Sequence, residues 1–366
     1  MKVDYIHFYL DDARVWRDWF INSLNFDSAN SFLVPLIQSE HNSHAHTEVV
    51  RSGSVCFVLS SPVSDRSPVA KFLQKHPSGV ADVAFNVNNV EEAITKAKTG
   101  GAKILEPIQW RYQGDKYIKW SKISAWGDLT HTLIERGSLK SDREVNYSSK
   151  QFHNYYYTAV DHIVLNIPTG YLKHAVIWYE KVFGFQPQQT FNIQTQHSAL
   201  HSRVMVSSDG EIQFPINEPA SKNSQIQEFL DVNQGPGIQH IALRTNNLVE
   251  RINQLSSKGL SFLPISQNYY ADIQKRVGFP LSSEELIAII QQQILVDWDE
   301  KNSHKLLLQI FTKPIFGEPT FFFEFIERRC KAQGFGEGNF RALFKVMEEE
   351  QIKRVYTKIN GVLTEE

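Results

Sequence analysis

Hydrophobic and polar positions follow the same order twice along this chain of 366 residues. Each half opens with the alternation of a half-buried strand and continues with apolar residues at helical spacing. The first strand, residues 3–10, precedes a helical pattern that contains Trp16 and Phe20. The strand that opens the second half, residues 160–166, precedes a similar pattern around Trp178. We therefore expect each half to begin with a β-strand and an amphipathic helix.

The remaining elements also follow the same order in both halves. A short helix is followed by a strand, a longer helix and two closing strands. The predicted helices are residues 69–74, 90–99, 226–232 and 248–257, and the predicted strands are 54–59, 80–87, 203–206, 212–216 and 238–245. Gly101 and Gly259 follow the longer helices, where a C-terminal glycine fits. These patterns predict an α+β fold of four βαβββ-type modules, two in each half.

A polar stretch separates the two halves. Residues 138–152 contain several charged side chains and few apolar ones, which is typical of a linker. We therefore expect one domain at residues 1–137 and another at residues 153–366. Each of them is long enough to bury a core of its own.

The second half carries two further segments without a counterpart in the first. Residues 269–304 form an insertion with a helix at 282–293, which a Ser-x-x-Glu capping box begins. A glycine-rich run around Phe335 precedes a C-terminal helix at 340–350. Because glycines lower the cost of bending, this run favours a C-terminal segment that gates a pocket.

Composition narrows the classes of protein that fit this pattern. Hydrophobic residues make up 42% of the chain and charged residues 21%, as in ordinary globular proteins. A formal net charge of -2 excludes the basic surface that attracts nucleic acid or an anionic membrane. The apolar runs have only strand length, and Cys56 and Cys330 cannot build a disulfide framework. We therefore expect a cytoplasmic protein with neither a membrane span nor a nucleic-acid partner.

Only the second half carries metal-ligating residue types at three aligned strand positions. The aligned pairs are Tyr5 with His162, Asp82 with His240, and Thr132 with Glu324. A carboxylate in an apolar strand is costly unless it is paired, protonated or bound to a metal. Each residue alone also fits a simpler interpretation, a hydrogen-bonded core histidine or, for Glu324, an ion pair with Arg328 or Arg329. Their joint presence in one half and absence from the other favours a metal site.

The residue types at this site narrow the choice of metal. Two imidazoles and one carboxylate leave three coordination positions open, which suits Fe(II) because O2 and a chelating substrate can both reach it. Zinc is the competing assignment. The chain lacks the His-Glu-x-x-His helix that would give a zinc hydrolase its base. A second histidine group, His41, His44 and His46, lies in a polar stretch, and we expect a solvated loop there.

Seven motifs of the second half occur in the order typical of one enzyme family. They are Val160-Asp161-His162, Pro215-Ile216-Asn217-Glu218-Pro219, Ser224-Gln225-Ile226-Gln227, Gly237-Ile238-Gln239-His240, Leu306-Leu307-Leu308-Gln309-Ile310-Phe311-Thr312-Lys313-Pro314, Phe323-Glu324-Phe325-Ile326-Glu327-Arg328 and Gly334-Phe335-Gly336-Glu337-Gly338-Asn339-Phe340. With these motifs the chain resembles the 4-hydroxyphenylpyruvate dioxygenase family of the vicinal-oxygen-chelate superfamily. The resemblance implies two tandem vicinal-oxygen-chelate domains, each an open barrel of paired βαβββ modules, with a C-terminal gating helix.

The resemblance also implies a role for each matching residue. His162, His240 and Glu324 would ligate Fe(II). Polar contacts to the substrate would come from Ser202, Asn217, Gln225, Gln239 and Gln309, of which the three glutamines would act in catalysis. Aromatic walls would come from Phe311, Phe322, Phe335 and Phe340.

The reaction implied by the family joins 4-hydroxyphenylpyruvate and O2 to give homogentisate and CO2. Because the substrate carries its own 2-oxo acid, no separate 2-oxoglutarate is needed. Two alternatives stay open: a 4-hydroxymandelate synthase, which hydroxylates the benzylic carbon of the same substrate, and a metal-free small-molecule-binding protein of this fold. The family further implies a homodimer or homotetramer that serves tyrosine catabolism or quinone and tocopherol synthesis.

Overall fold

The structure, a computed structural model, describes residues 1–29, 44–138, 155–195 and 197–362. The elements of the first half are β1 (Lys2–Tyr9), α1 (Ala13–Leu24), β2 (Asp27–Ser28), β3 (Ala45–Ser52), β4 (Val55–Pro62), α2 (Pro68–Leu73), β5 (Gly79–Asn86), α3 (Val90–Thr99), β6 (Ile104–Gln113), β7 (Lys116–Ser124) and β8 (Thr130–Ser138). Those of the second half are β9 (Ala159–Asn166), α4 (Leu172–Phe183), β10 (Gln186–Gln194), β11 (Ala199–Val206), β12 (Gln213–Pro219), α5 (Gln225–Asn233), β13 (Gly237–Arg244), α6 (Leu248–Ser257), α7 (Gln267–Ile273), α8 (Ser283–Gln291), β14 (Leu295–Asp299), β15 (Asn302–Phe311), β16 (Phe322–Arg328) and α9 (Glu337–Val362).

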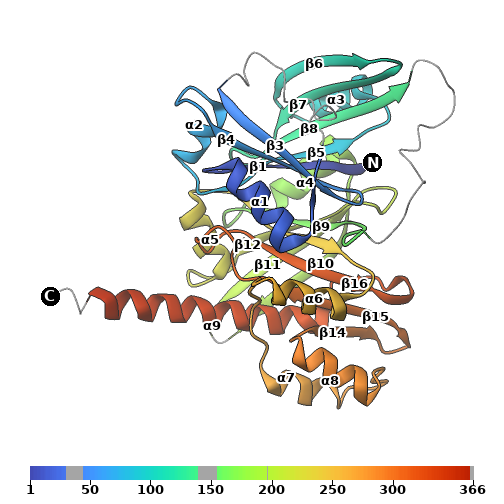
Figure 1. Ribbon diagram of the computed structural model, residues 1–366, viewed down its shortest axis with the longest axis vertical. Coiled ribbons are helices and arrows are strands. Elements are labelled where there is room, and N and C mark those ends of the chain that lie inside the picture. The colour runs from blue at the N-terminus through green and yellow to red at the C-terminus, as the bar shows by residue number, and fades with distance from the viewer. Residues whose placement is uncertain (30–43, 139–154, 196, 363–366) are drawn as a thin grey trace.

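The strands form two eight-stranded sheets of identical topology, one in each half (Figure 1). The strand orders are β2-β3-β4-β1-β5-β8-β7-β6 and β10-β11-β12-β9-β13-β16-β15-β14. In each sheet the first strand of the half pairs antiparallel with the first strand of its second module. The expected α+β fold of two duplicated halves is confirmed.

Strand register confirms the alignment of the two halves residue by residue. The equivalent rows across the central strands are Tyr5, Ala84 and Thr132 in the first half and His162, Ala242 and Glu324 in the second. Local capping chemistry is repeated as well. Asn89 caps α3 by accepting the N–H of Glu92, and Asn247 caps α6 by accepting the N–H of Glu250.

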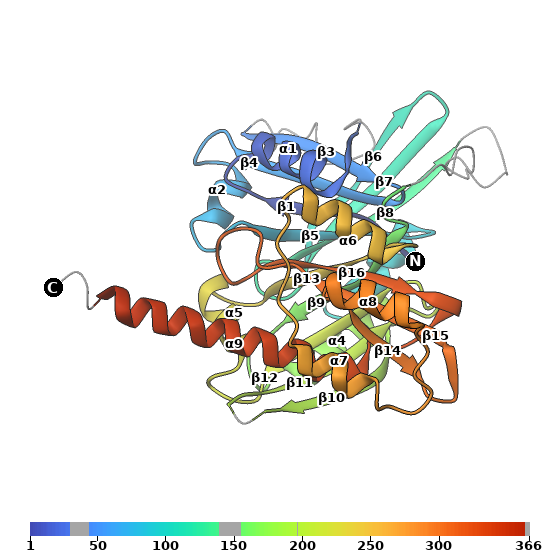
Figure 2. The ribbon, with the colours of Figure 1, turned by 60° about the horizontal axis from the view of Figure 1, so that its bottom comes forward.

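The two halves lie against each other (Figure 2), and buried residues of both form one hydrophobic core. Phe8 of β1 contacts Phe321 at a centroid distance of 5.3 Å, and Phe57 of β4 stacks on Phe323 at 5.8 Å. All four rings are almost fully buried. Aromatic pairs of this kind stabilise an interface beyond the area they bury, so these contacts help to hold the two halves together.

Three strands close each half, rather than the two expected. The additional strands are β6 and β14, at the outer edges of the two sheets. The predicted insertion is therefore shorter than 269–304, because β14 and β15 occupy its C-terminal part as counterparts of β6 and β7. Strands β3 and β10 were also not expected, since their alternation is largely polar and much of their length is exposed or half-buried.

Several local expectations change in detail. His46 lies on β3, with Nε2 2.8 Å from Glu48 Oε1, rather than in a solvated loop, and His41 lies outside the described residues. Ser282 caps α8 as expected by accepting the N–H of Glu285. The reciprocal half of the capping box is absent from the described contacts, because the Glu285 carboxylate pairs with Arg329. The predicted linker falls on residues outside the described ranges, apart from Ser138 at the end of β8.

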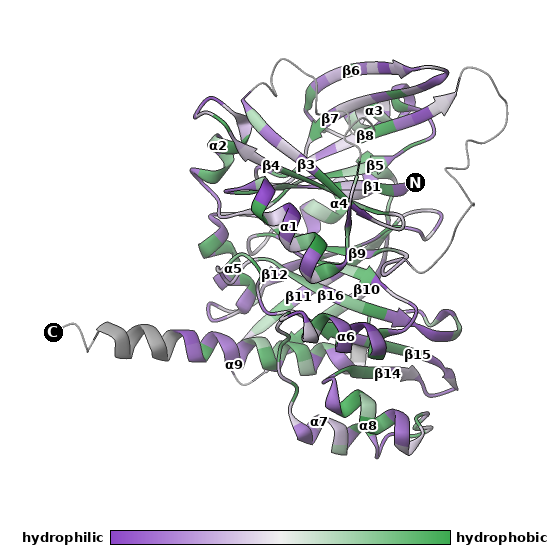
Figure 3. Cartoon of the chain, viewed as in Figure 1, coloured by the Kyte–Doolittle hydropathy of each residue, from purple (hydrophilic) through white to green (hydrophobic). Residues whose placement is uncertain are grey.

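The C-terminal helix α9 is longer than the predicted 340–350 and crosses the open face of the second sheet (Figure 1). Its apolar residues gather at the end that packs on the sheet, and hydrophilic residues follow towards the C-terminus (Figure 3). Phe344 and Val346 are buried in that packed part. Among the helices that the structure describes, none has the length and apolar character required to span a bilayer.

Candidate active site

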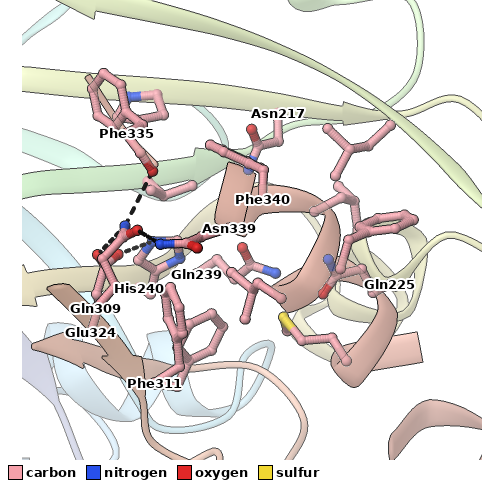
Figure 4. Close-up of a pocket in the computed structure, with 18 of the residues that line it drawn as sticks. Asn217, Gln225, Gln239, His240, Gln309, Phe311, Glu324, Phe335, Asn339 and Phe340 are labelled. Atoms are coloured by element: carbon pink, nitrogen blue, oxygen red, sulfur yellow. Dashed lines mark hydrogen bonds and ion pairs between the residues drawn. The ribbon is translucent and has the colours of Figure 1, made fainter. Parts of the chain in front are cut away.

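A cavity lies within the second half, between the strands of its sheet and the helices α5 and α9 (Figure 4). Its empty space measures about 600 Å³, with the open solvent at its mouth included. Strands β9, β12, β13, β15 and β16 supply imidazole, carboxylate and amide side chains, whereas α9 supplies mostly apolar ones. The cavity therefore has a polar wall of strands and an apolar cover.

The three predicted ligand residues meet at one wall of this cavity. His162 Nε2 lies 3.0 Å from Glu324 Oε2, and His240 Nε2 lies 3.6 Å from the same oxygen. One ligand atom from each of the three residues falls within 4.8 Å of the others. All three side chains are buried, with Glu324 only 1% exposed. The structure thus brings together the triad that the sequence singled out.

A β-bulge lies directly before each of the two histidines of the triad. Asp161 is the extra residue of β9 where it pairs with β13, and Gln239 is the extra residue of β13, with three residue pairs between the two bulges. In a regular strand, neighbouring side chains point to opposite faces. A bulge re-aims a side chain, so Gln239 and His240 both line the cavity although they are consecutive.

The carboxylates and the imidazoles at this site shift one another's pKa values. Burial alone would lower the pKa of His162, but the carboxylates of Glu324 and Asp161 outweigh it and raise that pKa to about 9. Burial would raise the pKa of Glu324, but the two imidazoles hold it at about 2. The pKa of His240 is lowered, chiefly by burial. Glu324 is therefore an anion, ready to bind a cation.

Asp161 holds His162 from behind. Asp161 Oδ1 lies 3.0 Å from His162 Nδ1, so that Nε2 is the nitrogen that faces Glu324. Arg328 binds both Asp161 oxygens, at 2.7 and 2.8 Å, and Arg244 adds a further contact at 2.8 Å. Burial opposes charge on Asp161, but Arg328 and His162 hold its pKa well below the usual range. A carboxylate behind a ligating imidazole fixes its tautomer and orientation.

These residues fit a divalent transition metal. Two imidazole nitrogens and one carboxylate oxygen are close together, buried, and open on the cavity side. Imidazole and carboxylate ligands suit Fe(II), and Zn(II) accepts the same donors. The donor set therefore supports a metal centre without fixing the identity of the metal.

Three of the predicted substrate contacts line the cavity away from the triad. They are Asn217, Gln225 and Gln239, and Figure 4 shows Gln225 across the cavity from Glu324. Asn217 Oδ1 and Gln225 Oε1 are buried and have no hydrogen-bond partner among the described residues. Buried acceptors without partners are costly, so they favour a ligand that donates a hydrogen bond to them.

Ser202 does not line the cavity, whereas Gln309 lines it beside the triad. Ser202 is opposite Asn217 in the pairing of β11 with β12. Gln309 lies at the metal end, where its Nε2 donates to Glu324 Oε1 at 2.9 Å and to the Phe335 carbonyl at 3.1 Å. Its amide is therefore engaged by the protein.

The four predicted phenylalanines all line the cavity. Phe322 stacks on the His240 imidazole at a centroid distance of 4.7 Å, and Phe335 meets the His162 ring edge-on at 5.3 Å. Phe340 is half-buried on α9. These rings enclose the ligand residues and limit the access of water to them.

Sequence reasoning did not assign several residues of the cavity. They are Val164, Leu200, Pro215, Ile226, Asn339, Leu343, Phe344 and Met347. Most are apolar and indistinguishable in the sequence from core residues. Asn339 is different, because an amide that follows three glycines and precedes Phe340 was visible in the sequence and could have been singled out.

Comparisons with known proteins identify the relatives of this chain. The family model for the Glyoxalase/Bleomycin resistance protein/Dioxygenase superfamily matches residues 159–275, within the half that holds the triad. The chain is 34% identical to the 4-hydroxyphenylpyruvate dioxygenase of Coccidioides posadasii, over 96% of this chain and 93% of that protein. It is 35% identical to the enzyme of the same name from Yarrowia lipolytica, over 96% and 92% of the two chains.

A solved structure has the same overall arrangement. It is a triple mutant of 4-hydroxymandelate synthase from Streptomyces coelicolor, with a TM-score of 0.81 and 25% sequence identity. The match covers 96% of this chain and 98% of that one. The similarity thus extends over both halves and not only over the one that holds the triad.

Proposed function

This chain belongs to the 4-hydroxyphenylpyruvate dioxygenase family, and from that premise we propose that it converts 4-hydroxyphenylpyruvate and O2 to homogentisate and CO2 with Fe(II). One observation carries the proposal: a buried His-His-Glu cluster lies at one end of a cavity with unpartnered polar acceptors elsewhere on its wall. That arrangement matches a substrate with a chelating 2-oxo acid at one end and a phenol at the other.

His162, His240 and Glu324 would hold the metal through two imidazole nitrogens and one carboxylate oxygen. When bound, Fe(II) supplies the Lewis-acid and redox chemistry that couples O2 to a chelating 2-oxo acid. Three protein ligands leave room for both. The metal-free binding protein becomes the weaker alternative, because such a protein has no use for three converging ligands.

The other residues of the cavity bind, orient and exclude water. One of the unpartnered oxygens of Asn217 and Gln225 would accept the phenol hydrogen, which fixes the ring relative to the metal end. Phe322 and Phe335 cover the ligands and keep water from the reacting groups. Asp161 keeps the Nδ1 proton of His162 and so leaves Nε2 for the metal.

The overall reaction balances without any further reductant. The keto acid loses CO2, and the carbon that remains becomes a carboxylate with one oxygen atom from O2. The other oxygen atom enters the ring as a hydroxyl group, while the side chain migrates to the neighbouring ring carbon. The four electrons that reduce O2 all come from the organic substrate.

The test is to incubate the purified protein with Fe(II), ascorbate, O2 and 4-hydroxyphenylpyruvate and to identify the product by mass spectrometry. Homogentisate, formed in equal amount with CO2, is the expected result. 4-Hydroxymandelate as the main product would replace ring by benzylic hydroxylation. Absence of substrate-dependent O2 consumption with iron bound would overturn the proposal.

Several further properties belong to the same proposal. We propose domains at residues 1–137 and 153–366, a cytoplasmic location, and a homodimer or homotetramer. Light scattering of the purified chain tests the oligomeric state, and a monomer at micromolar concentration would contradict it.

A further inference from the structure

A chain of hydrogen bonds leads from Glu324, the proposed metal ligand, to the helix α7, which does not line the cavity. Gln309 Nε2 donates to Glu324 Oε1 at 2.9 Å, and Asn339 Nδ2 donates to Gln309 Oε1 at 2.9 Å (Figure 4). Tyr269 of α7 then lies with its hydroxyl 2.7 Å from Asn339 Oδ1. The chain thus joins β16, β15, the start of α9 and α7.

The acceptors at the Glu324 end set the direction of these hydrogen bonds. The Glu324 carboxylate and the Phe335 carbonyl only accept, so Gln309 must present its NH2 group to them and its Oε1 to the NH2 group of Asn339. Asn339 Oδ1 then faces the Tyr269 hydroxyl, which accepts the N–H of Val296 at 2.7 Å and can donate to Asn339 Oδ1 at 2.7 Å or to the Val296 carbonyl at 2.9 Å. Asn339, Gln309 and Glu324 are each at most 2% exposed, so water does not compete for these groups.

The backbone before α9 packs directly on the same amide. Gln309 also donates to the carbonyl of Phe335 at 3.1 Å. A Cβ atom added to Gly336 would collide with Gln309 Oε1, and the φ of Gly336 is +71°, so this position requires glycine. The N–H of Gly338 donates to Asp297 of β14 at 3.2 Å. The start of α9 is therefore docked on Gln309 from two sides.

We propose that Tyr269 and Asn339 are positioning residues that hold the Gln309 amide against Glu324, so that the metal site is fully assembled only when α9 is docked. When α9 moves away, Asn339 and the Phe335 carbonyl leave Gln309 together. The amide is then free to rotate, and Glu324 Oε1 loses its donor. Glu324 Oε2, which faces the two histidines, is no longer held in one direction.

His162, whose partner is Asp161, is linked to the same segment before α9. Arg328, which binds both oxygens of Asp161 behind His162, also donates to the carbonyls of Ala332 at 3.3 Å and Gly334 at 2.8 Å. Residues 332–339 thus reach His162 through Asp161 and Glu324 through Gln309. Because coupling is reciprocal, metal binding must stabilise the docked helix as much as docking strengthens metal binding.

This inference rests on the proposed function only in taking His162, His240 and Glu324 as the metal ligands. The variants are Tyr269→Phe and Asn339→Asp, with Tyr270→Phe as the matched control. Tyr270 is the buried neighbour of Tyr269, and its hydroxyl has no partner among the described residues. Asn339→Asp keeps the size of the side chain but puts an acceptor where Gln309 needs a donor.

The measurements are anaerobic Fe(II) affinity and hydrogen exchange of residues 340–350 with and without Fe(II). In the wild type, Fe(II) should slow exchange of this part of α9. Tyr269→Phe and Asn339→Asp should weaken Fe(II) binding by about 10- to 100-fold, the range for residues that orient ligands, and abolish most of that slowing. Tyr270→Phe should leave both quantities unchanged.

A second comparison separates orientation from packing. Asn339→Ala removes more volume than Asn339→Asp but does not force Gln309 to turn its oxygen towards Glu324. Weaker Fe(II) binding in the aspartate variant than in the alanine variant supports orientation, and the reverse order overturns it. Wild-type affinity in Asn339→Asp, or equal effects of Tyr269→Phe and Tyr270→Phe, would also overturn the inference. If the wild type binds Fe(II) with these couplings but makes no homogentisate, only the proposed function fails.

Discussion

The two halves of the molecule have the same sheet and the same register, yet they place different chemistry at its centre. His162, His240 and Glu324 of the second half correspond to Tyr5, Asp82 and Thr132 of the first, and all six side chains are buried. The backbone therefore does not by itself make a metal site. Three substitutions on a fixed frame decide whether the centre holds ligands.

The surroundings of the two centres differ in charge as well. Phe311 is paired with Glu324, whereas the equivalent partner of Thr132 is Lys122. Lys122 is almost buried, and although burial would lower its pKa, Asp82 and other acidic neighbours outweigh burial and raise it. The first half thus carries its own ammonium ion where the second half offers an anionic site for a metal.

The two centres also differ in how they are filled. Trp120 pairs with Ile134 as Gln309 pairs with Ile326, so an indole replaces the amide that holds Glu324. Tyr5, Trp120 and neighbouring aliphatic residues form a packed cluster in the first half. The equivalent space in the second half is the cavity. A duplicated fold can therefore keep one copy for packing and open the other for a ligand.

The largest expected effect comes from removing a ligand on one side of this comparison. Glu324→Ala should lose bound iron and reduce turnover by more than about a hundredfold, because partners that merely orient ligands already cost up to that much. Thr132→Val, the matched change in the first half, should keep iron and turnover. Iron content by elemental analysis and O2 consumption measure both. An active, iron-loaded Glu324→Ala would contradict the triad.

The next largest effect should come from removing α9, which has no counterpart among the described residues of the first half. A chain that ends at Gln333 lacks Phe335, Asn339 and α9, so water can reach the ligands and Gln309 loses its donor. Homogentisate formation should fall by about a hundredfold, as expected for a misplacement of about 1 Å, while circular dichroism still shows the fold. Phe344→Ala, a milder change, should have the same direction. Full coupled turnover of the truncated chain would remove the gate from the mechanism.

A third prediction uses an ion pair that both halves share. Arg136 binds both oxygens of Asp4, at 2.6 and 2.8 Å, as Arg328 binds both oxygens of Asp161. Only Asp161 is followed by a metal ligand. Asp161→Asn should weaken Fe(II) binding by about tenfold, whereas Asp4→Asn should not change it.

The same two variants should both lose stability, because each leaves an arginine without a full partner. The loss should be about 3 kcal/mol for Asp161→Asn, the more deeply buried of the two, and smaller for Asp4→Asn. Urea unfolding and Fe(II) titration provide the two measurements. Equal effects of the two variants on iron binding would show that Asp161 does not orient His162.

The smallest effect concerns the internal cation of the first half. Lys122→Met should lower stability by about 1–3 kcal/mol at pH 7, because Asp82 loses its compensating charge, and it should leave iron binding unchanged. Burial raises the pKa of Asp82, and Lys122 partly opposes that shift. Without Lys122 the folded-state pKa rises further. The stability deficit should therefore shrink as the pH falls through that pKa and Asp82 becomes neutral. A deficit that grows in acid would contradict this account.

The sequence predicted the duplication and the triad because both depend on residue types at corresponding positions. It did not reveal β3 and β10, since their residues are mostly polar and their order comes from pairing with neighbouring strands rather than from burial. The contact of Gln309 with the substrate stays a prediction, and a lone amide in an apolar strand does not reveal its partner within the protein. Asn339 and Tyr269 bring that partner from segments far apart in the sequence, and only the folded chain shows their proximity.

The two β-bulges of the second sheet also occur in the first. The first half has them at the same places, with Asp4 and Ala81 as the extra residues that correspond to Asp161 and Gln239. Because both copies share them, the bulges belong to the ancestral module, while the histidine that follows each one is present in a single descendant. A deletion of one codon at either bulge would shift the following histidine to the opposite face of its strand, so each extra codon is as constrained as the ligand codon after it.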